Sequence, residues 1–174
     1  MKRALVLVLV FLAGIGGSAQ AADQVIFLVR HAERADQGAP AIPAAAQGTI
    51  PNDPSLSEAG KARAAKLAAL LASADVKHIF TTEFKRTRET AAPLAGKLKV
   101  DAVMSASRDP QPLIDAVRKT TGNVLIVGHS NTVPDLLKRL GLKETIAIAE
   151  NEYDNHFILV RRDAGDPTLI RLRY

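Results

Sequence analysis

The chain has 174 residues, no cysteine and a formal net charge of +5. This length suits one domain, and the lack of cysteine excludes disulfides, thiol nucleophiles and thiolate metal sites. A content of 47% hydrophobic and 24% charged residues is typical of a globular domain, and without a block of like charge or a basic–aromatic alternation the sequence does not favour nucleic-acid binding.

The first 21 residues have the pattern of a secretory signal peptide. Lys2 and Arg3 precede the apolar run ALVLVLVFLAGIG, and small residues follow up to Ala21. The run is shorter than the roughly 20 residues that a membrane span prefers. We therefore expect cleavage after Ala21, a periplasmic or secreted location and no stable membrane insertion after cleavage; a retained anchor is the alternative. The mature chain, residues 22–174, would have 21 basic and 18 acidic residues, a net charge of +3.

Strands and helices are expected to alternate along the mature chain. Apolar runs at residues 25–29 and 124–127 predict buried strands of a largely parallel sheet, because both faces of each run are apolar. Shorter runs at 79–80 and 100–103 predict two more strands. Apolar residues at helical spacing predict four intervening helices, over residues 55–74, 83–98, 109–120 and 131–141.

Local signals mark the ends of these helices. Ser55 or Ser57 is expected to cap the first helix. Pro93 is expected to distort the second, whereas the prolines of the third lie near its start, where they are tolerated. Gly141 is expected to end the fourth.

The C-terminal part of the chain has the pattern of a β-hairpin. Two strand-like runs, residues 156–162 and 168–174, are separated by the turn sequence DAGDP. Together with the preceding alternation, this order predicts an α/β fold: a three-layer α/β/α sandwich with a mostly parallel central sheet and an antiparallel edge hairpin, in one domain.

Residues 35–54, ADQGAPAIPAAAQGTIPNDP, form a long segment without periodicity that contains four prolines. Loops of this length are usually functional or disordered. The segment directly follows Arg34, so we expect it to lie over the site that the residues before it build.

Two of the predicted strands end in a histidine. The first ends in VRHAER, with Arg30 and His31, and the other in VGHSN, with His129. Ligands of open α/β sheets collect at the carboxyl ends of strands. Arg86 and Arg88 follow a third strand and are expected at the same end of the sheet.

This combination of arginines and imidazoles predicts an anion site. Several positive groups at one edge would repel one another unless an anion lay among them, and arginine pairs bidentately with phosphate oxygens. The helix that begins near Asn131 adds backbone N–H groups and the positive end of its dipole. The sequence therefore predicts a phosphorylated ligand.

Four segments resemble the motifs of the histidine phosphatase superfamily, which is also called phosphoglycerate mutase-like. LVRHAER resembles the Arg-His-Gly signature, LSEAGKARAAKLA the Leu-Ser/Thr-x-x-Gly helix, TTEFKRTRETA the second arginine segment and VLIVGHSNTV the second histidine segment. The motifs occur in the family order and span nearly the whole mature chain. The best match is the short branch of phosphohistidine phosphatases and broad phosphomonoesterases.

The resemblance implies a role for each matching residue. His31 matches the nucleophile that accepts the phosphoryl group, Arg30 and Arg86 match the arginines that hold phosphate oxygens, and His129 matches the second pocket histidine. Asn131 occupies a position where relatives have an asparagine near the phosphate. We expect no cofactor and no metal, because arginines and His129 supply the positive charge; His78 and His156 are isolated and are interpreted as structural.

Two positions depart from the family pattern. Ala32 replaces the glycine of the signature, a small change that should still fit a tight turn. Ser130 stands where one branch has the aspartate that acts as proton donor. Glu33 is the candidate proton donor that we name, and Glu83, Glu152 and Asp154 are weaker candidates. A phosphohistidine substrate has a good leaving group and needs an acid less, which favours such substrates slightly.

The resulting prediction is an exported, metal-independent phosphatase with a phosphohistidine intermediate. Its partner would be a phosphorylated small molecule or a phosphoprotein. The alternative is a non-catalytic module of the same fold that binds a phosphorylated ligand. A phosphoglycerate mutase is disfavoured by the leader and by the short chain, and binding to anionic lipid is disfavoured by the small mature charge. The sequence does not indicate an oligomeric state.

Overall fold

The computed structural model describes residues 23–36, 53–162 and 165–174. The expected signal peptide and most of the proline-rich segment lie outside this part of the chain. The elements alternate as expected and end in two consecutive strands. In chain order they are β1 (Gln24–Arg30), α1 (Glu58–Leu70), β2 (Val76–Thr82), α2 (Lys85–Leu98), β3 (Ala102–Ser105), α3 (Gln111–Lys119), β4 (Asn123–Gly128), α4 (Thr132–Arg139), β5 (Asn155–Arg161) and β6 (Thr168–Arg173).

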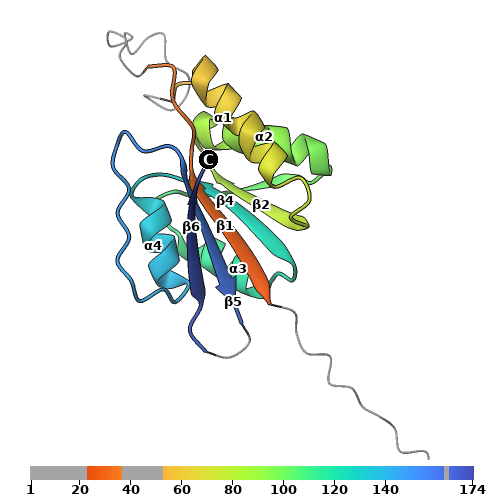
Figure 1. Ribbon diagram of the computed structural model, residues 1–174, viewed down its shortest axis with the longest axis vertical. Coiled ribbons are helices and arrows are strands. Elements are labelled where there is room, and N and C mark those ends of the chain that lie inside the picture. The colour runs from red at the N-terminus through yellow and green to blue at the C-terminus, as the bar shows by residue number, and fades with distance from the viewer. Residues whose placement is uncertain (1–22, 37–52, 163–164) are drawn as a thin grey trace, which may run out of the picture.

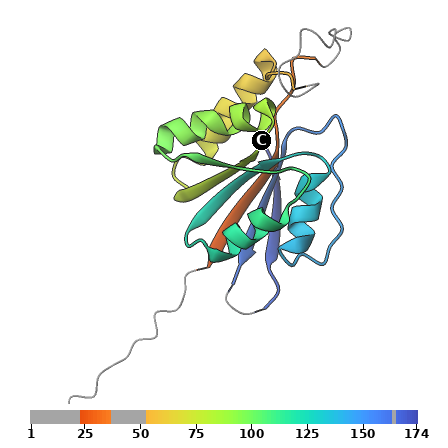
Figure 2. The same cartoon turned by 180° about the vertical axis from the view of Figure 1, so that it is seen from behind.

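One six-stranded sheet has the order β3-β2-β4-β1-β5-β6. β1 to β4 are parallel to one another, while β5 runs antiparallel to β1 and β6 antiparallel to β5. Helices α1 and α2 lie on one face of the sheet (Figure 1), and α3 and α4 lie on the other (Figure 2). The α/β sandwich with an antiparallel edge hairpin is therefore confirmed.

The pleat of β1 explains its continuous apolar run. Ile26 and Leu28 belong to the buried cluster under α3 and α4, whereas Phe27 and Val29 belong to the cluster under α1 and α2. A strand between two helical layers must be apolar on both faces. The edge strand β3 differs, because Val103 and Met104 are more than half exposed.

Most of the expected helix signals are confirmed. The Ser57 side chain caps α1 by accepting a hydrogen bond from the backbone of Gly60. Gly141 follows α4 with a φ of 105°, in the left-handed region that glycine favours. Pro93 lies inside α2, which nevertheless continues to Leu98. Among the described residues, no helix has the length and hydropathy that would let it cross a membrane.

Candidate active site

The two strand-end histidines lie side by side because β1 and β4 are neighbours. Arg30 is in register with Gly128, and the backbone N–H of His31 donates to the Gly128 carbonyl at 2.8 Å. The rings of His31 and His129 then meet edge to face, with centroids 5.3 Å apart. Both side chains are buried. The structure thus brings together two imidazoles that are 98 residues apart in the sequence (129 minus 31).

The contacts of His31 suit a nucleophile. Its Nδ1 lies 2.8 Å from the Ala32 carbonyl, which can only accept, so Nδ1 bears the proton and Nε2 keeps its lone pair. Burial is the main cause that lowers the pKa of His31 to about 3, against the opposing effect of the Ala32 carbonyl. The charges of His129 and the nearby arginines lower it further. His31 is therefore neutral at physiological pH, as a nucleophile must be.

His129 is oriented by the last residue of β2 and by a residue just after this strand. Its Nε2 lies 3.0 Å from the Thr82 hydroxyl, and the Phe84 ring packs against the imidazole at a centroid distance of 5.3 Å. Burial, followed by the charge of Arg86, lowers the pKa of His129 to about 4. Thr82 and Phe84 were not predicted as site residues, because their side chains have no phosphate chemistry of their own.

Arg86 lies in the first turn of α2 and is only 9% exposed. Its guanidinium stacks on the Phe84 ring at 4.1 Å. Its Nε and Nη1 are buried and have no hydrogen-bond partner among the described residues, although Nη1 lies 3.7 Å from an Asp53 oxygen. Buried donors are nearly always paired in folded proteins. This guanidinium, which has a long ion pair with Asp53 and two donors without a hydrogen bond among the described residues, is the main structural indication of an anion site.

Arg30 is oriented differently from the sequence expectation of a free phosphate ligand. Its Nη1 donates to the carbonyls of Ala149, Glu150 and Glu152, at 2.9, 2.9 and 3.1 Å. Its Nη2 contacts the Glu150 carboxylate at 3.0 Å and the Tyr153 hydroxyl at 3.3 Å. Only Nε lacks a hydrogen-bond partner among the described residues.

Arg30 therefore fixes residues 149–153 beside the two histidines. The Tyr153 ring lies 5.9 Å from that of His31, and the Ser130 hydroxyl donates to the second Glu150 oxygen at 2.6 Å. The connection was not visible in the sequence, because Arg30 and Tyr153 are separated by 123 residues.

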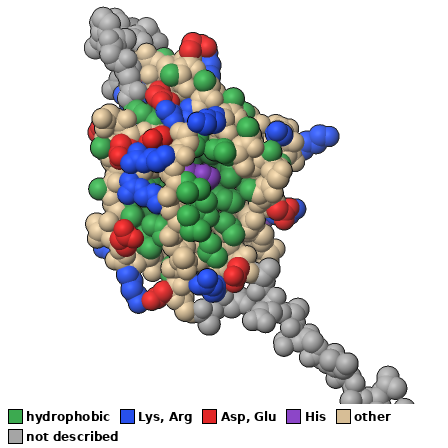
Figure 3. Space-filling view, in the orientation of Figure 1, with side chains coloured by type: hydrophobic (Ala, Val, Ile, Leu, Met, Phe, Trp, Pro, Cys, Tyr) green, Lys and Arg blue, Asp and Glu red, His purple; other side chains and the backbone are tan. Residues whose placement is uncertain are grey.

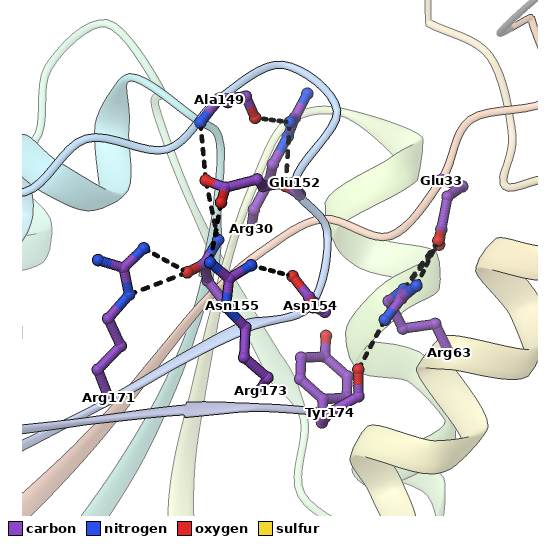
Figure 4. Close-up of polar contacts among 10 residues, drawn as sticks. All are labelled: Arg30, Glu33, Arg63, Ala149, Glu152, Asp154, Asn155, Arg171, Arg173 and Tyr174. Carbon is purple, nitrogen blue, oxygen red and sulfur yellow. Dashed lines mark hydrogen bonds and ion pairs between the residues drawn. The ribbon is translucent and has the colours of Figure 1, made fainter.

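Glu33, the named candidate for the proton donor, is bound to an arginine. Its carboxylate accepts hydrogen bonds from Arg63, the shortest of 2.6 Å, and Arg63 also donates to the Tyr174 carbonyl (Figure 4). Burial alone would raise the pKa of Glu33, but the Arg63 hydrogen bonds, a backbone hydrogen bond and the charge of Arg63 together outweigh burial and lower the pKa. An ionised carboxylate held in this way is poorly suited to donate a proton.

The other acidic candidates are also held by partners. Glu152 and Asp154 both accept hydrogen bonds from Arg173 (Figure 4). The hydrogen bond from the Ala149 backbone, followed by that from Arg173, lowers the pKa of Glu152 to about 2. Glu83 accepts two hydrogen bonds from Ser107, at 2.7 and 2.9 Å. The pKa of Glu83 and that of Glu152 are lowered, which is the opposite of what favours a general acid.

Helix α1 contacts the backbone that follows His31. Ser57 donates its backbone N–H to the Glu33 carbonyl at 2.9 Å. The approach is so close that a Cβ on Gly60 would lie 2.2 Å from this carbonyl oxygen. Ala32 is fully buried against Leu56 and Ala64. The glycine of the helix motif thus lets α1 support the loop that carries His31.

An open cleft of about 600 Å³ extends from this site toward α4. His129, Arg86 and Asn131 lie in its wall, and Arg108 adds positive charge, whereas Arg139 is paired with Asp135 of the same wall. Asn131 is the residue before α4, and its side chain makes no capping hydrogen bond to the helix. The end of α4 therefore does not hold the side-chain amide of Asn131. Among the described residues, no group of three His, Asp or Glu could hold a metal ion.

Comparisons with known proteins agree with this arrangement. Residues 26–109 match the model of the histidine phosphatase superfamily (branch 1). This part of the chain belongs to the histidine phosphatase superfamily. No curated protein matches the sequence.

Solved structures of this superfamily share the fold. A candidate phosphohistidine phosphatase SixA from Agrobacterium tumefaciens is 24% identical, with a TM-score of 0.61 over 86% of this chain and 98% of that one. The protein histidine phosphatase SixA in complex with tungstate is 14% identical, with a TM-score of 0.63 over 86% and 96%. A mycobacterial glucosyl-3-phosphoglycerate phosphatase in complex with VO3 is 13% identical, with a TM-score of 0.63 over 86% and 98%.

Burial of the site histidines makes the stability of this protein depend on pH. The pKa values of His31 and His129 are lowered to about 3 and about 4, from 6.5. Between these values and 6.5 the unfolded chain binds protons that the folded chain does not. The free energy of unfolding therefore falls with decreasing pH, by up to about 1.4 kcal/mol per pH unit for each histidine.

We expect His31→Asn to weaken this pH dependence. Urea denaturation of wild type and variant, in phosphate-free buffers from about pH 6.5 to about pH 4.5, measures the slope. The free energy of unfolding of the variant should change less steeply with pH than that of wild type, by up to the contribution of one histidine. Equal slopes would mean that His31 is not held neutral by the fold.

Proposed function

We propose that this protein is an exported, metal-independent phosphatase that hydrolyses a phosphomonoester or a phosphohistidine through a phosphoenzyme formed on His31. The fold and the family support phosphatase activity. The observation that carries the finer proposal is the neutral His31, with the lone pair on Nε2, beside His129 and the buried Arg86, two of whose donors make no hydrogen bond among the described residues.

In the first step, Nε2 of His31 attacks the phosphorus atom in line with the leaving group. A nitrogen–phosphorus bond forms while the bond to the leaving group breaks, and the Ala32 carbonyl continues to hold the Nδ1 proton. Arg86 and His129 stabilise the negative charge of the equatorial oxygens. Water then attacks the phosphorus atom, which releases inorganic phosphate and regenerates neutral His31.

The leaving group favours a phosphohistidine substrate over an alkyl ester. An alkoxide must gain a proton as it leaves, and the candidate carboxylates near the site are bound to partners. An imidazole leaving group needs this proton less. The open cleft of about 600 Å³ would also admit the side chain of a phosphoprotein.

The decisive assay compares substrates. The purified protein is incubated, with a metal chelator present, with a phosphohistidine-bearing protein and separately with a chromogenic phosphomonoester. We expect release of phosphate from both, faster from the phosphohistidine. Tight binding of phosphate without any turnover would instead support the alternative, a non-catalytic phospho-ligand-binding module. Export is tested separately, by finding the processed chain in the periplasmic fraction or the medium.

Arg86 provides a sharper test of the site. We expect Arg86→Ala to lower the rate by more than about tenfold, because a buried cation no longer stabilises the transition state. Arg88→Ala is the matched control, since Arg88 is exposed on the same helix turn. Steady-state rates of both variants, with urea denaturation as a check on folding, measure the effect. A near-normal rate for Arg86→Ala would remove Arg86 from the site.

A further inference from the structure

The active-site cleft shares a wall residue with a second open cleft. The second cleft has a volume of about 260 Å³ and lies between the C-terminal ends of α3 and α4 and residues 161–162 and 165–167. Arg139, the last residue of α4, lines both clefts. Thr132 and Asp135 of the first cleft lie on the same side of α4, at helical spacing from Arg139. We call the two clefts together the basic groove.

The net positive charge of the protein is concentrated in the basic groove. Two aspartates line it, against six arginines: Arg86, Arg108, Arg118, Arg139, Arg161 and Arg162. The net charge of these walls is +4, and the described part of the chain, with 21 basic and 17 acidic residues, is also +4. The rest of the described chain is therefore neutral overall. On the face seen in Figure 3, basic side chains accordingly lie beside acidic ones around a central hydrophobic area.

Several arginines of the basic groove have neutral partners or none. Arg118 donates to the Arg139 carbonyl at 3.0 Å, and Arg161 donates to the side-chain oxygen of Gln24 at 2.7 Å. Arg108 is exposed and makes no hydrogen bond or ion pair within the described residues. Neutral acceptors do not cancel the charge of a guanidinium, so these arginines can still attract an anion.

Acidic side chains neutralise little of this charge. Within the described residues, only one arginine of the basic groove has an ion pair shorter than 3 Å, namely Arg139 with Asp135 at 2.7 Å. The other aspartate, Asp166, pairs with Lys143, which lines neither cleft. A partner that carries carboxylates would supply the missing negative charge.

An acidic protein segment fits the basic groove better than a nucleic acid does. Grooves that bind single-stranded nucleic acids combine basic residues with aromatic side chains on which bases stack. Phe84 is the only aromatic residue among the described lining residues besides His129, and its ring already packs against His129 and Arg86. Carboxylates need no stacking surface, because the guanidinium fork alone binds them.

We propose that the basic groove binds acidic side chains of a phosphoprotein substrate, beside the phosphorylated residue. The proposal rests on the proposed function, since the groove begins at the candidate phosphate site. From Asn131 to Arg139 the helical rise is about 12 Å, a distance that an extended chain covers with about four residues. The acidic residues of the substrate are therefore expected from about the fourth position away from the phosphorylated residue.

Binding of an unphosphorylated peptide tests the groove without any turnover. A fluorescently labelled, glutamate-rich peptide is titrated with the protein and followed by anisotropy, beside a peptide in which glutamine replaces each glutamate. We expect the acidic peptide to bind at least about tenfold more tightly at about 20 mM salt, and this preference to disappear at about 0.5 M salt, where charges are screened. Arg118→Glu should weaken binding of the acidic peptide at least about fivefold. Lys119→Glu is the matched control, because Lys119 is exposed on the same helix but lines neither cleft.

The two substitutions change the net charge equally, so equal weakening by both would show a general charge effect and overturn the proposal. Equal binding of the acidic and the glutamine peptide would also overturn it. Tighter binding of a labelled single-stranded oligonucleotide with the same number of negative charges would indicate a nucleic-acid groove instead. Failure of the proposed function is seen separately: acidic peptide bound through Arg118, without release of phosphate from any substrate, would support the groove and reject the enzyme.

Discussion

Replacement of His31 by alanine should lower the rate of phosphate release at least about 1000-fold, because the chain then lacks the atom that forms the covalent intermediate. Phosphate should still bind, since Arg86 and His129 remain. Steady-state kinetics with a phosphohistidine protein measure the rate, and calorimetric titration with inorganic phosphate measures the binding.

His78→Ala is the matched control for this prediction. His78 lies on β2 and contacts the Thr121 carbonyl at the end of the sheet away from the site. Its loss should leave the rate within about twofold of wild type, as expected for a residue without a role in the transition state. If His31→Ala retained a comparable rate, the covalent route through His31 would be wrong.

Replacement of Gly60 by valine should disrupt both stability and activity. A Cβ at this position would lie 2.2 Å from the Glu33 carbonyl oxygen, so either α1 or the loop after His31 must move. Such overpacking against backbone commonly lowers the free energy of unfolding by about 1–3 kcal/mol. The movement would also break the hydrogen bond from Ser57 to Glu33 that positions the loop. Urea denaturation and the phosphatase assay measure the two effects.

Gly96→Ala provides the opposite control in helix α2. A Cβ on Gly96 meets nothing within 4 Å, and alanine is favoured over glycine inside a helix by about 0.5–1 kcal/mol. This variant should therefore be slightly more stable than wild type and equally active. A Gly60→Val protein with wild-type stability would show that α1 does not constrain the loop.

The fold was predictable because its signals are local. The two-faced apolar runs of β1 and β4 require helical layers on both sides, and the turn sequence before residue 168 predicts the hairpin. The same local signals place His31 and His129 at strand ends. The adjacency of β1 and β4 then brings the imidazoles together, and this depends only on sheet topology.

The orientation of polar side chains was not predictable in the same way. Arg30 directs its Nη atoms to residues 149–153, and Glu33 pairs with Arg63, because each finds partners more than 25 residues away. Thr82 and Phe84 contact His129, but they lie at an ordinary strand–helix junction, and their positions in the sequence do not single them out. Contacts of this kind depend on the packed structure, and sequence spacing does not reveal them.

Identification of the phosphorylated residue tests the account most directly. The wild-type protein is mixed with a phosphohistidine protein, quenched within milliseconds and digested, and the phosphopeptides are mapped by mass spectrometry. We expect an alkali-stable, acid-labile phosphoryl group on His31. Turnover with the phosphoryl group on His129 or Ser130, or turnover without any covalent intermediate in rapid-quench experiments, would contradict it.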